Sequence, residues 1–294
     1  MMTADRIESL SRAAWAGQMV GDALGASVEG WSSSRIKARY PNGLDEMLPN
    51  SPIFGYRPEG SVTDDTQMAL CLHRSLVDSN GWNPKKAMEY YLGWFATNPP
   101  DVGCATCAAM LGRPMPESQG NGTLMRVLPI ALWAAAHPDF NWELAAREDA
   151  ALTHPNPANA DCNAVFVYAF LQAVEQGTTA QQVYERTLAW ARTQNLVPTV
   201  LQAVEHAASM LPVCDLSNRG WVVLALHVAL YQLLHANDFR SALVDVVSSG
   251  GDTDTNAAIT GALLGAFFGE LSIPAAWLAC VRANNGPEYT VLLP

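Results

Sequence analysis

The sequence predicts an all-α protein that forms one compact domain over residues 1–294, and three observations lead to that expectation. Apolar residues recur with the 3.6-residue period of a helix through most of the chain. No stretch alternates apolar and polar residues for long enough to indicate a strand. No linker or charge run divides the chain, and a 49% apolar content is enough for a sizeable core.

Taken in order, the apolar periods and their flanking Gly and Pro residues predict a series of helices, with boundaries good to a few residues. These helices are expected at 5–24, 68–76, 84–97, 101–111, 124–130, 143–152, 158–176, 179–193, 197–211, 220–236, 238–247, 257–269 and 273–283. Residues 30–62 show no period and are punctuated by Pro and Gly, so they are predicted to be a long irregular loop, a feature that is often functional.

Charge, cysteine content and hydropathy exclude several classes of protein. A net charge of −11 argues against a nucleic-acid binder. Cys104 and Cys107 form a lone C-x-x-C without a second pair, so they are interpreted as small buried side chains on one helical face. The start of the chain lacks a signal-peptide pattern, and the longest apolar runs are too short for a membrane span. A reducing, cytoplasmic location is expected.

The first predicted helix carries glycines one turn apart. Gly21 and Gly25 lie on one face, which allows another backbone to approach closely. Asp22 and Glu29 are expected at or just beyond the helix end, and from this segment alone they are interpreted as surface acids.

Two clusters of Thr and Asp stand far apart in the chain, each directly before a predicted helix. They are Thr63-Asp64-Asp65-Thr66 and Asp252-Thr253-Asp254-Thr255. Helix capping explains one carboxylate or hydroxyl at such a position, and for either cluster alone it is an equally good interpretation. Two clusters of the same composition exceed that need. Crowded hard oxygen donors favour Mg²⁺, Mn²⁺ or Ca²⁺ over zinc.

Three further segments carry weaker signals. Asp101 precedes a short helix, where an N-cap is the simple interpretation. The Gly120-Asn121-Gly122 turn exposes backbone N–H groups that could receive a phosphate. His154 lies in a turn bounded by proline, where capping of a helix end and ligand binding are equally good interpretations.

Taken together, these motifs resemble the ADP-ribosylglycohydrolase family, which includes the dinitrogenase reductase-activating glycohydrolases that act on ADP-ribosylarginine. The resemblance covers about residues 10–270. The segments that carry it are Gly21-Asp22-x-x-Gly25-x-x-x-Glu29, Thr63-Asp64-Asp65-Thr66, Gly120-Asn121-Gly122-x-x-Met125-Arg126, His154 and Gly250-Gly251-Asp252-Thr253-Asp254-Thr255.

The resemblance implies an all-α fold with a metal cleft that holds two Mg²⁺ or Mn²⁺ ions at helix N-termini. The implied metal ligands are Thr63, Asp64, Asp65, Asp252, Asp254 and Thr255. The implied ADP-ribose contacts are Gly120, Asn121, Gly122, Thr123, Met125 and His154. The implied acid and base are Glu29 and Asp101, although Gly103-Cys104 departs from the family pattern beside Asp101.

The function expected from the resemblance is metal-dependent glycosidase activity that removes ADP-ribose from a modified protein side chain, foremost the N-glycosidic bond to arginine. The partners are then an ADP-ribosylated protein as substrate and ADP-ribose as product. Two alternatives stay open. One is hydrolysis of O-linked or small-molecule ADP-ribose conjugates. The other is an immunity protein that neutralises an ADP-ribosylating toxin by binding or hydrolysis.

Overall fold

The computed structural model describes residues 3–49 and 57–293, and in these ranges all the regular secondary structure is helical, with no strand. Its helices have the following bounds: α1 Ala4–Ala26, α2 Ser33–Arg39, α3 Asp64–Ser79, α4 Pro84–Phe95, α5 Cys104–Met110, α6 Leu128–Ala136, α7 Trp142–Thr153, α8 Pro157–Ala173, α9 Ala180–Thr193, α10 Pro198–His206, α11 Val222–His235, α12 Phe239–Ser248, α13 Thr253–Phe268, α14 Ala275–Asn284 and α15 Pro287–Thr290. Two short 3₁₀ helices, η1 Asn121–Thr123 and η2 Glu270–Ser272, complete the set.

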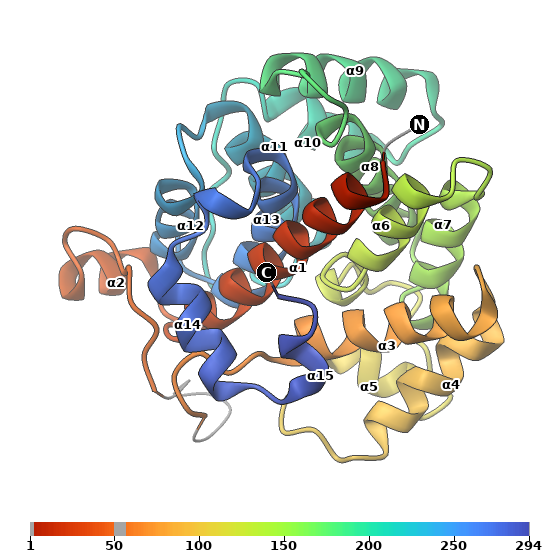
Figure 1. Ribbon diagram of the computed structural model, residues 1–294, viewed down its shortest axis with the longest axis horizontal. Coiled ribbons are helices and arrows are strands. Elements are labelled where there is room, and N and C mark those ends of the chain that lie inside the picture. Colours follow the sequence, from red (N-terminus) through yellow and green to blue (C-terminus); the bar gives the residue numbers. More distant parts are fainter. Residues whose placement is uncertain (1–2, 50–56, 294) are drawn as a thin grey trace.

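Helices α1 and α13 form an antiparallel pair through the middle of the molecule (Figure 1). Their backbones touch at glycines. A Cβ added at Gly17 would lie 2.0 Å from the carbonyl oxygen of Gly261, and one added at Gly21 would lie 2.0 Å from that of Ala257. One added at Gly25 would lie 2.3 Å from the carbonyl oxygen of Thr253. The predicted close approach at Gly21 and Gly25 is therefore confirmed, and its partner is the start of the second Thr/Asp helix.

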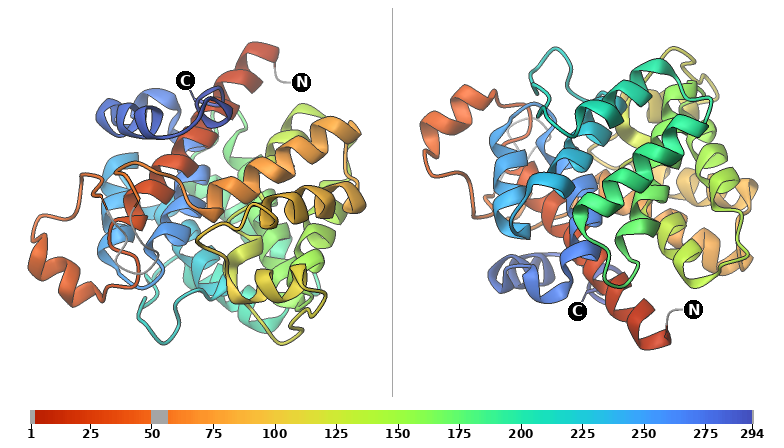
Figure 2. Two further views of the ribbon diagram at one scale, coloured as in Figure 1. Left: turned by 90° about the horizontal axis from the view of Figure 1, so that it is seen from below. Right: turned by 90° about the horizontal axis from the view of Figure 1, so that it is seen from above.

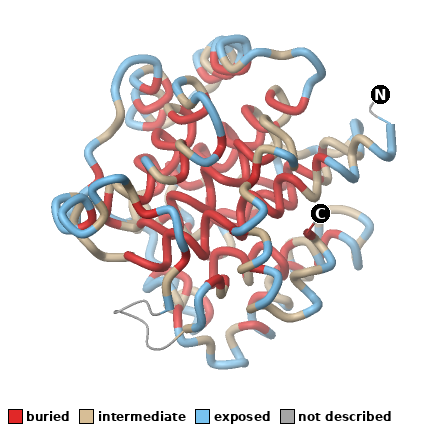
Figure 3. Tube along the Cα trace, turned by 60° about the vertical axis from the view of Figure 1, so that its left-hand side comes forward, coloured by how far each residue is buried: buried red, intermediate tan, exposed pale blue. Residues whose placement is uncertain are grey.

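The remaining helices surround this pair. α11, α12 and α8 pack against α13, while α3, α6 and α14 pack against α1. Figure 2 shows α3 and α4 side by side on one side of the pair, with α9 and α10 on the other. Buried backbone concentrates along the central helices and exposed backbone along the outer turns (Figure 3). α13 is buried on every face from Thr253 to Gly265, as its small side chains predict.

The all-α prediction is confirmed, and most predicted helices lie within about four residues of the observed ones. The helix predicted at 124–130 is displaced, since α6 spans Leu128–Ala136, and the helix predicted at 197–211 ends early, since α10 ends at His206. Ser33–Arg39 forms α2 inside the segment predicted to be irregular, where only Ile36 of the helix is buried. Residues 50–56 of that segment lie outside the described residues. Cys104 is exposed and Cys107 half-buried, so their prediction as buried side chains is wrong. In the described ranges, no helix has both the length and the apolar character to cross a membrane.

Candidate metal centre and ligand cavity

The C-terminal end of α1 and the N-termini of α3 and α13 meet at a cavity of about 480 Å³. It brings together most of the residues that the sequence singled out. Those that line it are Glu29, Asp64, Asp65, Asp101, Gly120, Asn121, Gly122, Met125, His154, Asp252, Asp254 and Thr255. Thr63 and Thr123 lie behind this surface and are buried. The two Thr/Asp clusters are thus neighbours in space.

The first cluster is built on the start of α3. Thr63 is the N-cap, and its Oγ1 accepts from the backbone N–H of Asp65 while donating to Asp65 Oδ2 at 3.0 Å. Thr255 Oγ1 of the second cluster lies 3.5 Å from the same carboxylate oxygen. The capping interpretation therefore holds for Thr63, but it does not account for Asp64 or Asp65.

The second cluster is built on the start of α13. Gly250 and Gly251 precede it with φ of +76° and +80°, the left-handed region that favours glycine. Asp252 occupies the N-cap position without a capping bond from its side chain, and it accepts from Asn121 Nδ2 at 2.7 Å. One carboxylate oxygen each of Glu29, Asp252 and Asp254 lie within 4.8 Å of one another.

Asp22 is a member of the site that the sequence analysis placed wrongly. It is fully buried within α1 rather than at the surface. Its carboxylate accepts from the backbone N–H groups of Thr63 and Thr66 at 3.0 and 3.2 Å, and from Thr66 Oγ1 at 2.6 Å. This carboxylate satisfies the N-terminus of α3 from outside the helix, and it leaves the α3 acids free for other partners. The sequence signal for the burial of Asp22 was the adjacent Gly21, which lies on the face of α1 that contacts α13.

Burial dominates the electrostatics of the cluster. It raises the pKa of Asp64, Asp65 and Asp254 well above the ordinary range, and neighbouring carboxylates add to that effect. Burial, helped by the charges of Asp252 and Asp101, raises the pKa of Glu29 to about 8. Like charges held this close together in a buried site favour either bound protons or a bound cation.

The donor set fits a divalent cation. Every candidate ligand is a carboxylate or hydroxyl oxygen, the chemistry that Mg²⁺, Mn²⁺ and Ca²⁺ prefer. Glu29 Oε2 and Asp65 Oδ1 are buried and have no hydrogen-bond partner among the described residues. Such buried orphan acceptors are costly unless a further ligand satisfies them.

These pKa shifts predict how a cation changes the stability of the folded protein with pH. Because the folded-state pKa of Glu29 lies near 8 and its ordinary value is 4.5, the metal-free fold binds the proton more tightly than the unfolded chain. The stability that the Glu29 proton gives to the metal-free fold is fully present below pH 4.5, the ordinary pKa, and is lost as the pH rises toward 8. We therefore expect the rise in melting temperature on adding Mg²⁺ or Mn²⁺ to grow between about pH 5 and 8. Thermal denaturation with metal and with chelator measures it, and a shrinking increment would contradict the assignment.

Asp101 also lines the cavity, and it pairs with a cationic side chain that the sequence analysis did not find. Arg57 Nη2 donates to Asp101 Oδ2 at 3.2 Å, and both side chains are only 12% exposed. Burial raises the pKa of Asp101 to about 6, and the Arg57 charge opposes that rise. The N-cap of α5 is Gly103, so the capping interpretation of Asp101 is wrong. Arg57 carries no local motif, and only the fold brings it to Asp101.

The Gly120–Gly122 turn and His154 line the same cavity. The backbone of Asn121 donates to Gly220 O at 2.9 Å, and Asn159 Nδ2 donates to Gly120 O at 2.5 Å, so the turn is anchored from two sides. His154 is the C-cap residue of α7, but its ring contacts Thr153 and the glycine turn rather than a helix carbonyl. The ligand-facing interpretation of His154 is favoured over the capping one.

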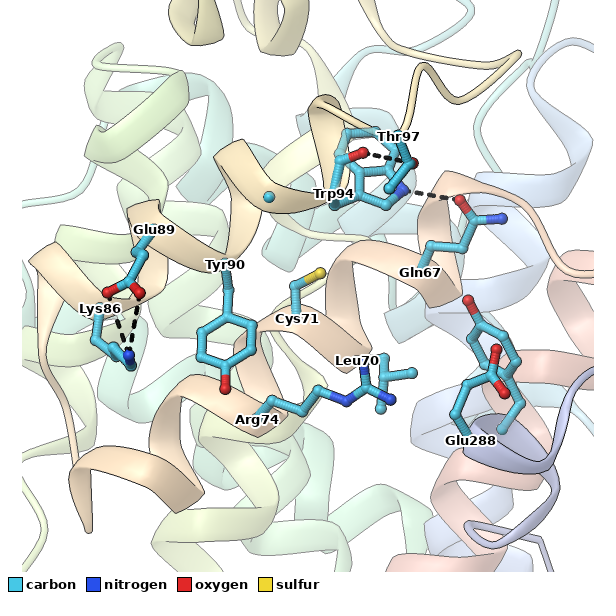
Figure 4. A pocket seen from close by; sticks show the side chains of 12 residues that line it. Gln67, Leu70, Cys71, Arg74, Lys86, Glu89, Tyr90, Trp94, Thr97 and Glu288 are labelled. Carbon is cyan, nitrogen blue, oxygen red and sulfur yellow. Dashed lines mark hydrogen bonds and ion pairs between the residues drawn. The ribbon is translucent and has the colours of Figure 1, made fainter.

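A second cavity of about 470 Å³ lies between α3, α4 and α15 (Figure 4). Two pairs of its polar side chains bond to each other: Trp94 Nε1 donates to Gln67 Oε1, and Lys86 pairs with Glu89. Burial raises the pKa of the Cys71 thiol to about 11, which makes it a poor nucleophile at neutral pH. The two cavities are similar in size, and the carboxylate chemistry distinguishes the first.

The sequence of the chain is similar to those of known proteins. The chain matches the family model described as ADP-ribosylglycohydrolase over residues 3–292. It is 30% identical to the ADP-ribosyl-[dinitrogen reductase] glycohydrolase of Rhodospirillum rubrum, covering 95% of this chain and 92% of that protein. It is 24% identical to the ADP-ribosylarginine hydrolase Tri1 of Serratia proteamaculans, covering 92% of this chain and 75% of that one.

A solved structure described as an ADP-ribosylglycohydrolase-related protein complex superposes with a TM-score of 0.82. The two chains are 30% identical, and the match covers 98% of this chain and 96% of that one. With the fold and the extent of the family match in agreement, this chain belongs to the ADP-ribosylglycohydrolase family.

Proposed function

We propose that this protein hydrolyses the N-glycosidic bond between ADP-ribose and an arginine side chain of a modified protein, with two Mg²⁺ or Mn²⁺ ions at the carboxylate cluster. The observation that carries the proposal is the cluster itself, with Glu29, Asp252 and Asp254 converging beside the buried acids of α3. The resemblance of the chain to an ADP-ribosylarginine hydrolase supports the choice of acceptor.

The metal ions would be held by the carboxylates of Asp64, Asp65, Asp252 and Asp254. Thr63 and Thr255 offer hydroxyl oxygens beside them, since each lies within 3.5 Å of Asp65 Oδ2. When bound, such a pair of ions supplies a positive centre that orients vicinal ribose hydroxyls and lowers the pKa of a water molecule.

Asp101 is proposed to bind the guanidine of the substrate and to protonate that guanidine as it leaves the ribose. The Arg57–Asp101 pair supports this role, because that carboxylate already accepts a hydrogen bond from one guanidinium group. A pKa near 6 gives Asp101 a usable protonated fraction close to neutral pH. Glu29, which also lines the cavity, is proposed to accept the proton of the attacking water once the positive charge of bound cations lowers its pKa from the metal-free value of about 8.

The test compares acceptors on wild-type protein and Asp101→Asn. Release of ADP-ribose is measured from arginine-linked protein, serine-linked peptide and an O-acyl ester of ADP-ribose. We expect the arginine substrate to be preferred. Asp101→Asn should slow its turnover by about 10²- to 10⁴-fold, the range of general acid catalysis, while affinity for free ADP-ribose is retained.

A matched control is Asp139→Asn, which removes an exposed carboxylate from the turn between α6 and α7. Its turnover should equal that of the wild type. Faster release from the serine-linked peptide or the ester would show that arginine is not the preferred acceptor. If the protein forms a stable complex with the modified protein or with an ADP-ribosylating toxin and releases no ADP-ribose, its function is binding and not hydrolysis.

A further inference from the structure

A buried polar network lies directly behind the glycine turn of the ligand cavity. Arg126 is fully buried, and its Nε and Nη2 donate to Asp149 Oδ2 at 3.0 Å and to Asp149 O at 2.8 Å. Tyr91 donates from its hydroxyl to the other carboxylate oxygen at 2.7 Å. With both oxygens of Asp149 engaged, the guanidinium is held in one orientation.

The remaining Arg126 nitrogen, Nη1, has two acceptors, Gly122 O at 3.3 Å and Thr153 Oγ1. Nη1 donates to Thr153 Oγ1 at 2.9 Å, and Thr153 Oγ1 lies 2.9 Å from Nδ1 of His154. An arginine can only donate, so this contact uses an acceptor position of the hydroxyl. Among the described residues, Nδ1 of His154 is the acceptor in reach of the hydroxyl hydrogen. If Nδ1 carried a proton, the hydroxyl hydrogen of Thr153 would be buried without an acceptor, which is unfavourable.

The hydroxyl therefore donates to Nδ1, and this bond sets the state of the ring. Burial, together with the positive charge of Arg126, lowers the pKa of His154 to about 3, so the ring is neutral at physiological pH. A neutral imidazole carries one N–H, and here Nδ1 is the acceptor. The proton must then be on Nε2.

Nε2 is the ring atom next to the glycine turn at the cavity wall. A Cβ added at Gly120 would lie 3.1 Å from Nε2, and one added at Gly122 would lie 3.2 Å from the adjacent Cε1. His154 is only 2% exposed yet lines the cavity, and its Nε2 has no hydrogen-bond partner in the part of the chain that the structure describes. A buried ring therefore presents one unsatisfied N–H to the ligand space.

We propose that Thr153 is a positioning residue that holds His154 in the Nε2–H tautomer, so that His154 donates one neutral hydrogen bond to an oxygen of the bound ligand. On the proposed function, on which the ligand half of this inference rests, that oxygen belongs to the ADP-ribose moiety. The network makes His154 a fixed donor. It does not act as a general acid or base.

The tautomer is tested first, on ligand-free protein, by long-range ¹H–¹⁵N NMR of the six histidines, with the His154 signals assigned from a His154→Asn spectrum. We expect protonated Nε2 and unprotonated Nδ1 in the wild type. Thr153→Ser keeps the hydroxyl and should preserve that pattern. Thr153→Val removes it and should give a mixture of the two tautomers. Protonated Nδ1 in the wild type would overturn the proposal, even if Thr153→Val fails to fold.

Ligand binding is tested by calorimetry with free ADP-ribose. We expect Thr153→Val to weaken binding in proportion to the Nε2–H tautomer that it loses, about twofold for an equal mixture, and Thr153→Ser to bind like the wild type. Equal affinity of all three proteins, with a changed tautomer in Thr153→Val, would overturn the ligand contact. Failure of wild-type protein to bind ADP-ribose would overturn the proposed function and that contact together. The NMR result would still stand as the measure of the Thr153 role.

Discussion

Asp254→Asn is expected to lose bound metal and hydrolytic activity together while keeping the fold. Asp254 is buried within reach of Glu29 and Asp252, and its Oδ1 accepts from the backbone N–H of Thr255 at 2.9 Å. The amide keeps the size and the capacity to accept that bond, but it removes the negative charge that a hard cation requires. We expect activity to fall by at least about 10²-fold, since the ligand oxygens act as one unit.

Metal content by elemental analysis and turnover at saturating Mg²⁺ or Mn²⁺ are the paired measurements. Because burial raises the pKa of Asp254 in the metal-free state, the neutral amide should leave the chelated protein as stable as the wild type or more stable. The added metal should then raise its melting temperature less. Full metal content in the folded variant would remove Asp254 from the ligand set.

Gly21→Ala is expected to cause a large loss of stability. Its Cβ would lie 2.0 Å from the carbonyl oxygen of Ala257 and 2.5 Å from the carbonyl carbon, both in the backbone of α13. Neither helix can yield by a side-chain rotation, so α1 and α13 must separate and the core on both sides must shift. We expect at least about 3 kcal/mol, the upper end for overpacking, and a fall in melting temperature on the order of 10 °C.

Gly93→Ala is the matched control. Gly93 also lies inside a helix, α4, but an added Cβ there would meet nothing within 4 Å. This substitution should raise stability by about 0.5–1 kcal/mol, because alanine loses less backbone entropy than glycine. Equal effects of the two substitutions in thermal denaturation would show that the α1–α13 contact does not require glycine at position 21.

Local patterns predicted the helices because apolar periodicity and caps are encoded within each segment. The clearest case is α13, because its small residues and the preceding Gly250-Gly251 turn predicted a tightly packed helix. α2 was missed because one buried side chain, Ile36, leaves no apolar period to detect. The C-x-x-C pattern misled because Cys104 faces outward from a helix too short to have two covered sides.

The site residues likewise include some that local sequence indicated and some that it did not. Repetition of Thr and Asp drew attention to both clusters, since such composition is visible without a fold. Asp22 and Arg57 were missed because their partners lie 41 and 44 residues along the chain. Thr153 carried no signal of its own, because its significance depends on a buried arginine on one side and His154 on the other.

The central claim is that the carboxylate cluster holds metal ions for removal of ADP-ribose from arginine. The most direct measurement is the release of labelled ADP-ribose from an arginine-modified protein, with Mg²⁺, with Mn²⁺ and with chelator. We predict release with at least one of the two metals and its loss on chelation. No release from protein that is shown to contain both metal ions would contradict the account.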